Sequence, residues 1–233
     1  HAGARGTGSA VTADTTVAAD AGGADQHARD RTAAAAGTAV AALAVDGAVG
    51  GLPAGAGAAV CTVTADAASA AGLARAIDGI ALDLALLCAG LYGPRSTGLQ
   101  APSEAEFDAV MHTNVLGAMR VLPQLADALA PGARVGVLSS RMACISQRSG
   151  HAGWLYRASK AALNSVLKDA ALAWSGRAVC VALHPGWVRT DMGGPRADLE
   201  VADSAAGIRR VMAGLTSADH GGFFNHDGAP LPW

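Results

Sequence analysis

Apolar residues gather in short runs along residues 57–233, and stretches with a helical repeat separate these runs. The runs that read as strands span residues 58–63, 82–88, 134–139, 178–184 and 222–225, and the helical stretches span 67–78, 103–129, 156–174 and 202–214. Strands that are apolar along their whole length are typical of a parallel sheet buried on both faces. The pattern therefore predicts an α/β fold, a single doubly wound parallel sheet with helices on both faces.

The helix predicted at 103–129 has a well-marked beginning. Ser103 follows Pro102 as an N-cap, and Glu106 completes a capping box. An apolar stripe then faces the predicted core, and its members are Phe107, Val110, Met111, Val115, Ala118, Leu122 and Leu125. Asn114 lies on this stripe in the middle of the helix. A buried amide is costly unless it is satisfied, so Asn114 either bonds locally or holds a water.

The first 60 residues differ in kind from the rest of the chain. They contain 22 Ala but no Ile, Phe, Met, Trp, Tyr, Lys, Glu or Asn, and Leu occurs only at positions 43 and 52. Ala and Gly bury little area, so this segment is poorly equipped to supply core strands. Its one strand-like run spans residues 38–45. We interpret residues 1–62 as a low-complexity, atypical part of one domain, of which 63–233 is the regular part.

Bulk composition limits which binding partners and which cellular compartment we expect. Half of the residues (51%) are apolar and the net charge is −2, which indicates a packed core and gives no reason to expect a nucleic-acid partner. We expect no membrane partner and a cytoplasmic protein, because no run of about 18 apolar residues and no charged-then-apolar leader is present. The scattered cysteines predict small buried side chains in a reducing compartment and no metal site; they are Cys61, Cys88, Cys144 and Cys180.

Tyr156 and Lys160 are the most informative pair, because the chain holds only two tyrosines and two lysines. A spacing of four places both side chains on one face of a helix. An ammonium beside a phenol lowers the phenol's pKa toward working pH and so prepares a general acid/base. The alternative is a helix start in which the tyrosine packs and the lysine is solvated.

Two strand ends supply further candidates. Ser139 and Ser140 end the strand at 134–139, and Pro185 and Gly186 follow the strand at 178–184. The carboxyl ends of parallel strands form the ligand crevice of a doubly wound sheet. A hydroxyl there polarises a substrate carbonyl, and Gly186 permits close approach of backbone to a ligand. The alternatives are an ordinary turn and an ordinary strand exit.

Together these motifs resemble the short-chain dehydrogenase/reductase family over about residues 64–233. The residues that carry the resemblance, in chain order, are Asn114, Ser140, Tyr156-x-x-x-Lys160 and Pro185-Gly186-x-Val188-x-Thr190. The chain looks closest to the C-factor-like branch, which it resembles in Leu91-Tyr92-Gly93-Pro94-Arg95, Ser139-Ser140-Arg141-Met142 and Phe223-Phe224-Asn225-x-Asp227-Gly228.

The resemblance implies a Rossmann-like fold and an NAD(P)-dependent oxidoreductase that interconverts a small-molecule carbonyl and a secondary alcohol. Tyr156 would be the acid/base, and Lys160 would lower its pKa and hold the nicotinamide ribose. Ser140 would hold the substrate oxygen, and Asn114 would anchor a water in a proton relay. Residues 141–155 carry an insertion, and residues 191–201 form a substrate lid. A homodimer or homotetramer through the helices at 103–129 and 156–174 is expected by analogy.

The family's cofactor positions map incompletely onto this chain. By resemblance they are Gly3, Arg5, Gly6, Gly8, Ala89, Gly90, Tyr156, Lys160, Pro185, Gly186, Val188 and Thr190. The glycine-rich turn lacks its leading Thr-Gly, and the Asn-Asn of the family motif at 87–90 is Leu87-Cys88 here. Asp46 favours NAD, whereas Arg5 favours NADP, so the choice between NAD and NADP stays open.

One hypothesis covers these losses: residues 1–62 do not encode the ancestral nucleotide-binding half, through a shifted reading frame or heavy divergence. Translation of the gene in its other two frames tests the frame explanation, which requires a Thr-Gly-x-x-x-Gly-x-Gly turn after an apolar strand. The damaged motif also leaves a rival function open, a non-catalytic protein on the same scaffold with a signalling or partner-binding role.

Overall fold

The computed structural model describes residues 43–45, 59–61, 73 and 77–233. Six strands form one sheet, in the order β1-β2-β3-β4-β5-β6. The strands are β1 Leu43–Val45, β2 Ala59–Cys61, β3 Leu82–Leu87, β4 Leu129–Leu138, β5 Ala178–His184 and β6 Gly222–Asn225. The strands predicted at 82–88, 178–184 and 222–225 are confirmed to within one residue. The runs at 58–63 and 38–45 overlap β2 and β1, and their other residues lie outside the described part.

Strand direction agrees with the prediction across most of the sheet. Neighbours from β2 to β6 pair in parallel, whereas β1 pairs antiparallel with β2. The expectation of a wholly parallel sheet is therefore wrong at this edge, where the short strand β1 runs antiparallel to β2. Among the described strands the spatial order follows the chain order, so these strands by themselves do not show the reversal of order of a doubly wound sheet.

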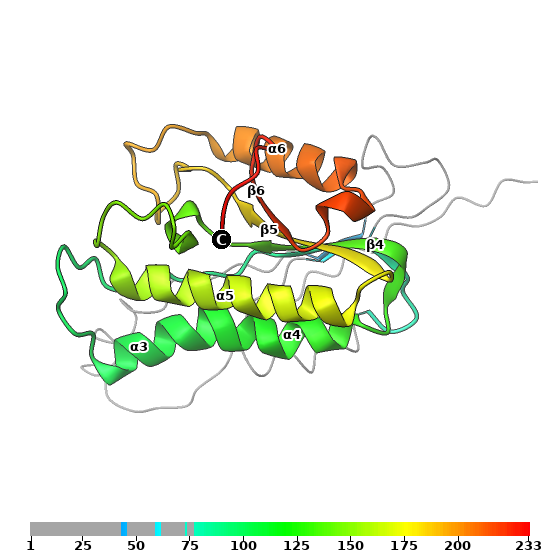
Figure 1. Ribbon diagram of the computed structural model, residues 1–233, viewed down its shortest axis with the longest axis horizontal. Helices are drawn as coiled ribbons and strands as arrows, with labels where there is room; N and C mark the ends of the chain where they lie inside the picture. The colour runs from blue at the N-terminus through cyan, green and yellow to red at the C-terminus, as the bar shows by residue number, and fades with distance from the viewer. Residues whose placement is uncertain (1–42, 46–58, 62–72, 74–76) are drawn as a thin grey trace, which may run out of the picture.

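Helices cover both faces of the sheet, as predicted (Figure 1). On one face lie α3 Glu104–Met111, α4 Gly117–Leu125 and α5 Trp154–Ala173, and on the other lies α6 Val201–Gly214. The central strands β3, β4 and β5 bury apolar side chains toward both layers. This arrangement confirms an α/β, Rossmann-like fold. The helix predicted at 67–78 lies mostly outside the described residues; Leu73 and Ile77 are buried in the core.

The predicted helix at 103–129 is divided. Both bonds of the capping box at Ser103 and Glu106 are present, and α3 begins where expected. A π-helix, η1 His112–Leu116, then separates α3 from α4, and the helix ends at Leu125. Within the predicted stripe, Phe107 is 46% exposed, because α3 turns only Val110 fully into the core.

Strand β4 begins five residues before the predicted run at 134–139. Leu129 pairs with Leu82, and the register then shifts so that Arg134 pairs with Leu84. Gly132, at φ 77°, accommodates this irregularity, because only glycine adopts positive φ without steric cost. In the sequence Pro131 and Gly132 are typical of a turn. The prediction therefore started the strand too late, because β4 runs through these residues with an irregular register.

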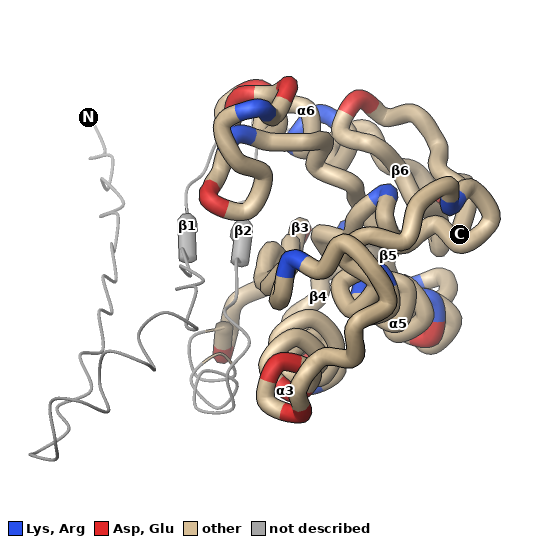
Figure 2. Tube along the Cα trace, turned by 90° about the vertical axis from the view of Figure 1, so that its left-hand side faces the viewer, with Lys and Arg blue, Asp and Glu red and all other residues tan. Residues whose placement is uncertain are grey.

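Charged residues are spread over the molecule, with acidic side chains at the start of α3 (Figure 2). Among the described residues, no helix combines the length and apolar character that a membrane crossing requires. The same part of the chain holds no cluster of three or more His, Cys, Asp or Glu side chains placed to bind a metal ion.

Candidate active site

Tyr156 and Lys160 lie one turn apart near the start of α5, and both side chains are buried. The helix follows Gly153, whose φ of 66° turns the chain sharply into the helix. Lys160 Nζ lies 5.9 Å from the centroid of the Tyr156 ring and donates a hydrogen bond to Leu138 O at 2.8 Å. The phenol and the ammonium thus share one site at the carboxyl end of β4.

The two ionisable groups are shifted toward their neutral forms. Burial raises the pKa of Tyr156 to about 12, with a smaller contribution from nearby Tyr92, although a hydrogen bond with Ser140 acts in the opposite direction. Burial also lowers the pKa of Lys160 to about 8. The expectation that the lysine brings the tyrosine pKa toward neutrality does not hold for the chain alone, because burial of the phenol outweighs the opposing hydrogen bond with Ser140.

The neighbouring serines have different partners. Ser139 Oγ donates to Asn164 Oδ1 on α5 at 2.5 Å, which ties the end of β4 to the helix. Ser140 Oγ accepts from Met142 N at 3.2 Å and caps a 3₁₀ turn, η2 Arg141–Ala143. Ser140 is also the serine that hydrogen-bonds with Tyr156. The structure therefore brings Ser140, and not Ser139, to the phenol.

Asn114 lies in the π-helix, a local geometry that is frequent at functional sites. Its Oδ1 accepts from Leu91 N at 2.7 Å, and its Nδ2 donates to Leu91 O at 2.8 Å and to Ser159 Oγ at 2.8 Å. Both amide hydrogens are used in these bonds. The buried amide is thus satisfied locally, and its Oδ1 keeps one lone pair beyond the bond from Leu91 N.

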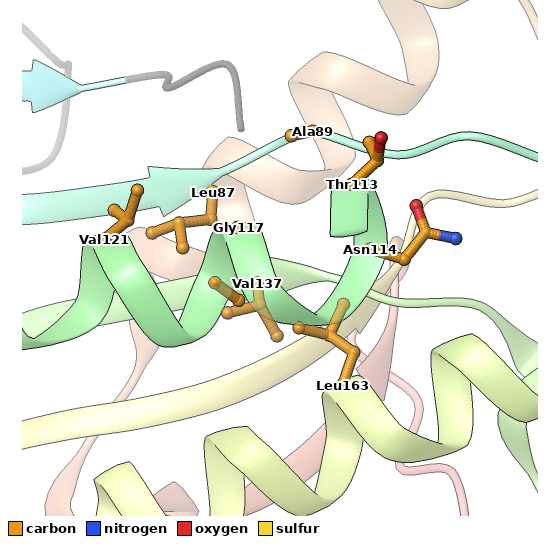
Figure 3. A pocket seen from close by; sticks show the side chains of 9 residues that line it. Leu87, Ala89, Thr113, Asn114, Gly117, Val121, Val137 and Leu163 are labelled. Atoms are coloured by element: carbon orange, nitrogen blue, oxygen red, sulfur yellow. The ribbon is translucent and has the colours of Figure 1, made fainter. Parts of the chain in front are cut away.

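A cavity of about 20 Å³ lies beside Asn114, between β3 and the helices that cover it (Figure 3). Its volume suffices for about one water. Apart from Asn114 and Thr113 its walls are apolar or glycine, formed by Leu87, Ala89, Gly117, Ala118, Val121, Val137 and Leu163. Lys160 does not line it, so this cavity is separate from the phenol and ammonium.

Small residues border the ammonium where β3 ends. Ala89 and Gly90 follow that strand, and a Cβ added to Gly90 would stand 3.1 Å from Lys160 Nζ and 3.7 Å from Asn114 Oδ1. A larger residue at position 90 would therefore crowd the ammonium. Glycine leaves this position open to a ligand.

The motif after β5 forms a folded loop. Gly186 has a φ of 87°, and a Cβ there would meet Leu199 Cδ2 at 2.9 Å. Val188 pairs with Leu199 as an isolated bridge. Thr190 Oγ1 accepts from Gly193 N at 3.1 Å, so its hydroxyl is engaged within the loop itself.

These residues fit the nicotinamide end of a dinucleotide. An ammonium has three donors, and the bond to Leu138 O uses one of them. Gly90 and Gly186 follow the carboxyl ends of β3 and β5, where an added Cβ would stand 3.1 Å from Lys160 Nζ and 2.9 Å from Leu199 Cδ2. The predicted pyrophosphate residues lie outside the described part of the chain; they are Gly3, Arg5, Gly6 and Gly8, together with Asp46.

Sequence reasoning missed the residues that flank the phenol. The ring of Tyr92 stacks on the ring of Tyr156 with centroids 4.7 Å apart and planes inclined by 22°. Arg95 Cζ lies 5.3 Å from the Tyr92 centroid. The signal was the rarity of tyrosine: the chain holds two, and both are at the site.

Comparisons with known proteins place this chain among oxidoreductases. The family described as enoyl-(acyl carrier protein) reductase matches residues 11–219, a range that reaches further toward the N-terminus than the resemblance over 64–233. The C-signal of Myxococcus xanthus is 41% identical over 123 residues, which cover 52% of this chain and 74% of that protein. The 1-hydroxy-2-glutathionyl-2-methyl-3-butene dehydrogenase of Rhodococcus sp. is 30% identical over 163 residues, 66% of this chain and 70% of that one.

Solved structures of a carbonyl reductase and of a short-chain dehydrogenase/reductase are also similar to this chain. The carbonyl reductase Sniffer of D. melanogaster superposes with a TM-score of 0.66 at 30% identity, over 71% of this chain and 74% of that one. A short-chain dehydrogenase/reductase of Burkholderia multivorans with bound NADP superposes with a TM-score of 0.64 at 30% identity, over 70% and 72% of the two chains.

Proposed function

Because the chain belongs to the short-chain dehydrogenase/reductase family, we propose that this NAD(P)-dependent oxidoreductase reduces a small-molecule carbonyl to a secondary alcohol at Ser140, Tyr156 and Lys160. The observation that carries the proposal is the convergence of three buried polar side chains from two elements. The hydrogen bond between Ser140 and Tyr156 joins the end of β4 to α5, and Lys160 lies one turn further along the helix.

Each side chain has a distinct task in this proposal. The bound nicotinamide supplies the hydride, and Lys160, Gly90 and Gly186 would hold its end of the cofactor. Ser140 donates a hydrogen bond to the substrate oxygen and polarises the carbonyl. Tyr156 gives its proton to the same oxygen as negative charge develops there. Lys160 faces that charge and stabilises it, which is the electrostatic contribution expected of a positioned cation.

The pKa values favour the reductive direction. With a pKa of about 12, Tyr156 carries its proton throughout the neutral range and is ready to donate it. Alcohol oxidation needs the phenolate form of Tyr156 instead. In the complex with the cofactor, the positive charge of Lys160 would favour this phenolate and so lower the pKa of Tyr156. We therefore expect carbonyl reduction at neutral pH and alcohol oxidation only at alkaline pH.

The test is Tyr156→Phe, measured as carbonyl-dependent oxidation of NADPH and of NADH. The substitution removes the proton donor and keeps the ring, so turnover is expected to fall by at least about 1000-fold while the melting temperature stays within a few degrees. Retained turnover in this variant would remove Tyr156 from the mechanism. Running both cofactors in parallel also decides between NAD and NADP.

A non-catalytic role on the same scaffold is the second candidate, favoured by the 41% identity to C-signal and by the incomplete glycine-rich turn. Binding separates the two functions. An oxidoreductase shows a melting shift with NADH or NADPH, whereas a protein with a degraded cofactor site shows none with either at millimolar concentration.

We also propose a homodimer or homotetramer through the outer faces of the helices on the α3–α4–α5 side. Its support is the exposure of large apolar side chains there, since Phe107, Met119 and Leu172 are 46%, 54% and 67% exposed. Sedimentation of Met119→Glu beside the unchanged protein tests it, and association that survives this charge would place the interface elsewhere.

A further inference from the structure

Residues 91–100 form a strap that runs from the end of β3 past the beginning of α5. Three hydrogen bonds fasten the strap to the segment that precedes Tyr156. Gly153 N donates to Ser96 O at 3.1 Å, and Trp154 Nε1 donates to Gln100 O at 3.1 Å. His151 Nε2 lies 3.1 Å from Thr97 O. These contacts hold the strap against the start of α5.

At its first turn the strap presents Tyr92 to Tyr156. The stacked pair, at 4.7 Å and 22°, leaves Tyr156 little freedom to tilt. Such offset aromatic pairs contribute beyond the area that they bury. A proton donor must hold its oxygen within a few tenths of an ångström of the productive position, so a fixed ring plane matters for transfer.

Arg95 joins this pair to a second segment. Its guanidinium lies over the Tyr92 ring at 5.3 Å, and its Nη2 donates to Met192 O at 2.9 Å and reaches Asp191 O at 3.4 Å. Those carbonyls belong to the folded loop that follows β5 and Gly186. One exposed side chain thus links the strap to the loop that follows β5.

Resting on the function proposed above, we propose that Tyr92 is a positioning residue for Tyr156 and that Arg95 is a latch that holds residues 191–192 against the strap. The Arg95 guanidinium then holds residues 191–192 against the strap and also holds the Tyr92 ring in its stacked position on Tyr156. Because Arg95 is exposed, its hydrogen bonds exchange readily with water, and the latch opens without breaking the core. A planar, forked donor suits this double task better than an ammonium.

Four variants test the proposal, with Arg209→Ala on the exposed side of α6 as the matched loss of an arginine. Tyr92→Phe keeps the stacked ring and should retain kcat within about threefold, whereas Tyr92→Leu should lower kcat about tenfold. Arg95→Ala should raise KM about fivefold through the lost hydrogen bonds, and Arg95→Lys should restore it only in part. Arg209→Ala should change neither constant.

A spectroscopic measurement reports on positioning without turnover. Tyr92→Phe and Tyr92→Leu each leave Tyr156 as the only tyrosine, so tyrosinate absorbance follows that phenol alone. Loss of the covering ring admits water, so the Leu variant should titrate at lower pH than the Phe variant. Absence of carbonyl reduction in the unchanged protein would refute the proposed function, and this titration would still decide the positioning role.

Two results would overturn the inference. The first is equal kcat and equal titration midpoints for Tyr92→Leu and Tyr92→Phe, which would leave the ring with a packing role only, seen as a lower melting temperature. The second is an unchanged KM in Arg95→Ala, which would show that residues 191–192 need no latch.

Discussion

The amide of Asn114 donates to Ser159 Oγ at 2.8 Å, a bond that joins the π-helix to α5 one residue before Lys160. The same side chain is bonded to both backbone groups of Leu91. Three segments distant in sequence therefore meet at one buried amide. The position of Lys160 relative to the end of β3 depends on this junction.

Replacement of Asn114 by leucine should be costly for that reason. The substitution keeps the branch at Cγ but leaves the backbone of Leu91 and the hydroxyl of Ser159 without their partner, so the free energy of unfolding should fall by about 2–4 kcal/mol. Urea unfolding measures the change. Ser165→Ala, on the exposed side of α5, is the matched polar loss, and equal stability of the two variants would contradict the junction.

The neighbouring serines should differ in their effect on activity. Ser140→Ala removes the hydroxyl beside Tyr156, so kcat should fall about 100-fold, and loss of the cap on η2 should lower the free energy of unfolding by about 1 kcal/mol. Ser139→Ala breaks the bond to Asn164, so it should lower the free energy of unfolding by about 1 kcal/mol and affect kcat less. Turnover and thermal melting of both variants provide the comparison. The reverse pattern would assign the substrate hydroxyl to Ser139.

Lys160→Met should stabilise the chain while it abolishes activity. Burial lowers the pKa of Lys160 to about 8, below the pKa of a lysine in the unfolded chain. At neutral pH folding must therefore bury a charged ammonium, and this lowers the free energy of unfolding. This depressed pKa means that stability is present at high pH and is lost as the pH falls through 8. The variant should gain about 1–2 kcal/mol at pH 7 over the unchanged chain, and the gain should vanish near pH 10.5. A gain that is constant with pH would contradict this account.

His184 should make the fold sensitive to acid. Its Nδ1 is buried without a hydrogen-bond partner, and its pKa is lowered to about 4 by burial and by the positive charges of Arg141 and His226, against the opposing effect of Asp227. Stability is therefore full above about pH 6.5 and is lost as the pH falls through about 4. His184→Gln should flatten this dependence in melting curves from pH 7.5 to 4. The exposed His112→Gln serves as control, and an equal slope in both variants would show that other groups cause the acid sensitivity.

The sequence predicted the regular parts of the fold because single segments encode them. The apolar runs of β3 and β5 and the capping box at Ser103 are local signals, and each element begins near its predicted residue. The π-helix and the early start of β4 follow from tertiary packing. Asn114 gains its partners only when α5 and the end of β3 are in place, and Gly132 resembles a turn until its strand is paired.

The proximity of Tyr156 and Lys160 was predicted, and the directions of their pKa shifts were not. Spacing alone places Tyr156 and Lys160 on one face of a helix, but burial, which sets the direction of both pKa shifts, depends on the whole fold. Tyr92 and Arg95 lie 64 and 61 residues before Tyr156, by subtraction of their numbers, so no local pattern connects them. The rarity of tyrosine and the motif Leu91-Tyr92-Gly93-Pro94-Arg95 drew attention to these residues, but neither showed what they contact.

The start of α5 also restricts which sequences can share this site. Gly153 combines a φ of 66° with a position at which an added Cβ would stand 2.4 Å from Tyr92 Oη. A side chain at 153 and a tyrosine at 92 therefore exclude each other. Among relatives, these two positions should change together, so a sequence with alanine at 153 should carry a smaller residue at 92. The pairing offers a way to recognise, from sequence alone, proteins that keep a second ring against the phenol of Tyr156.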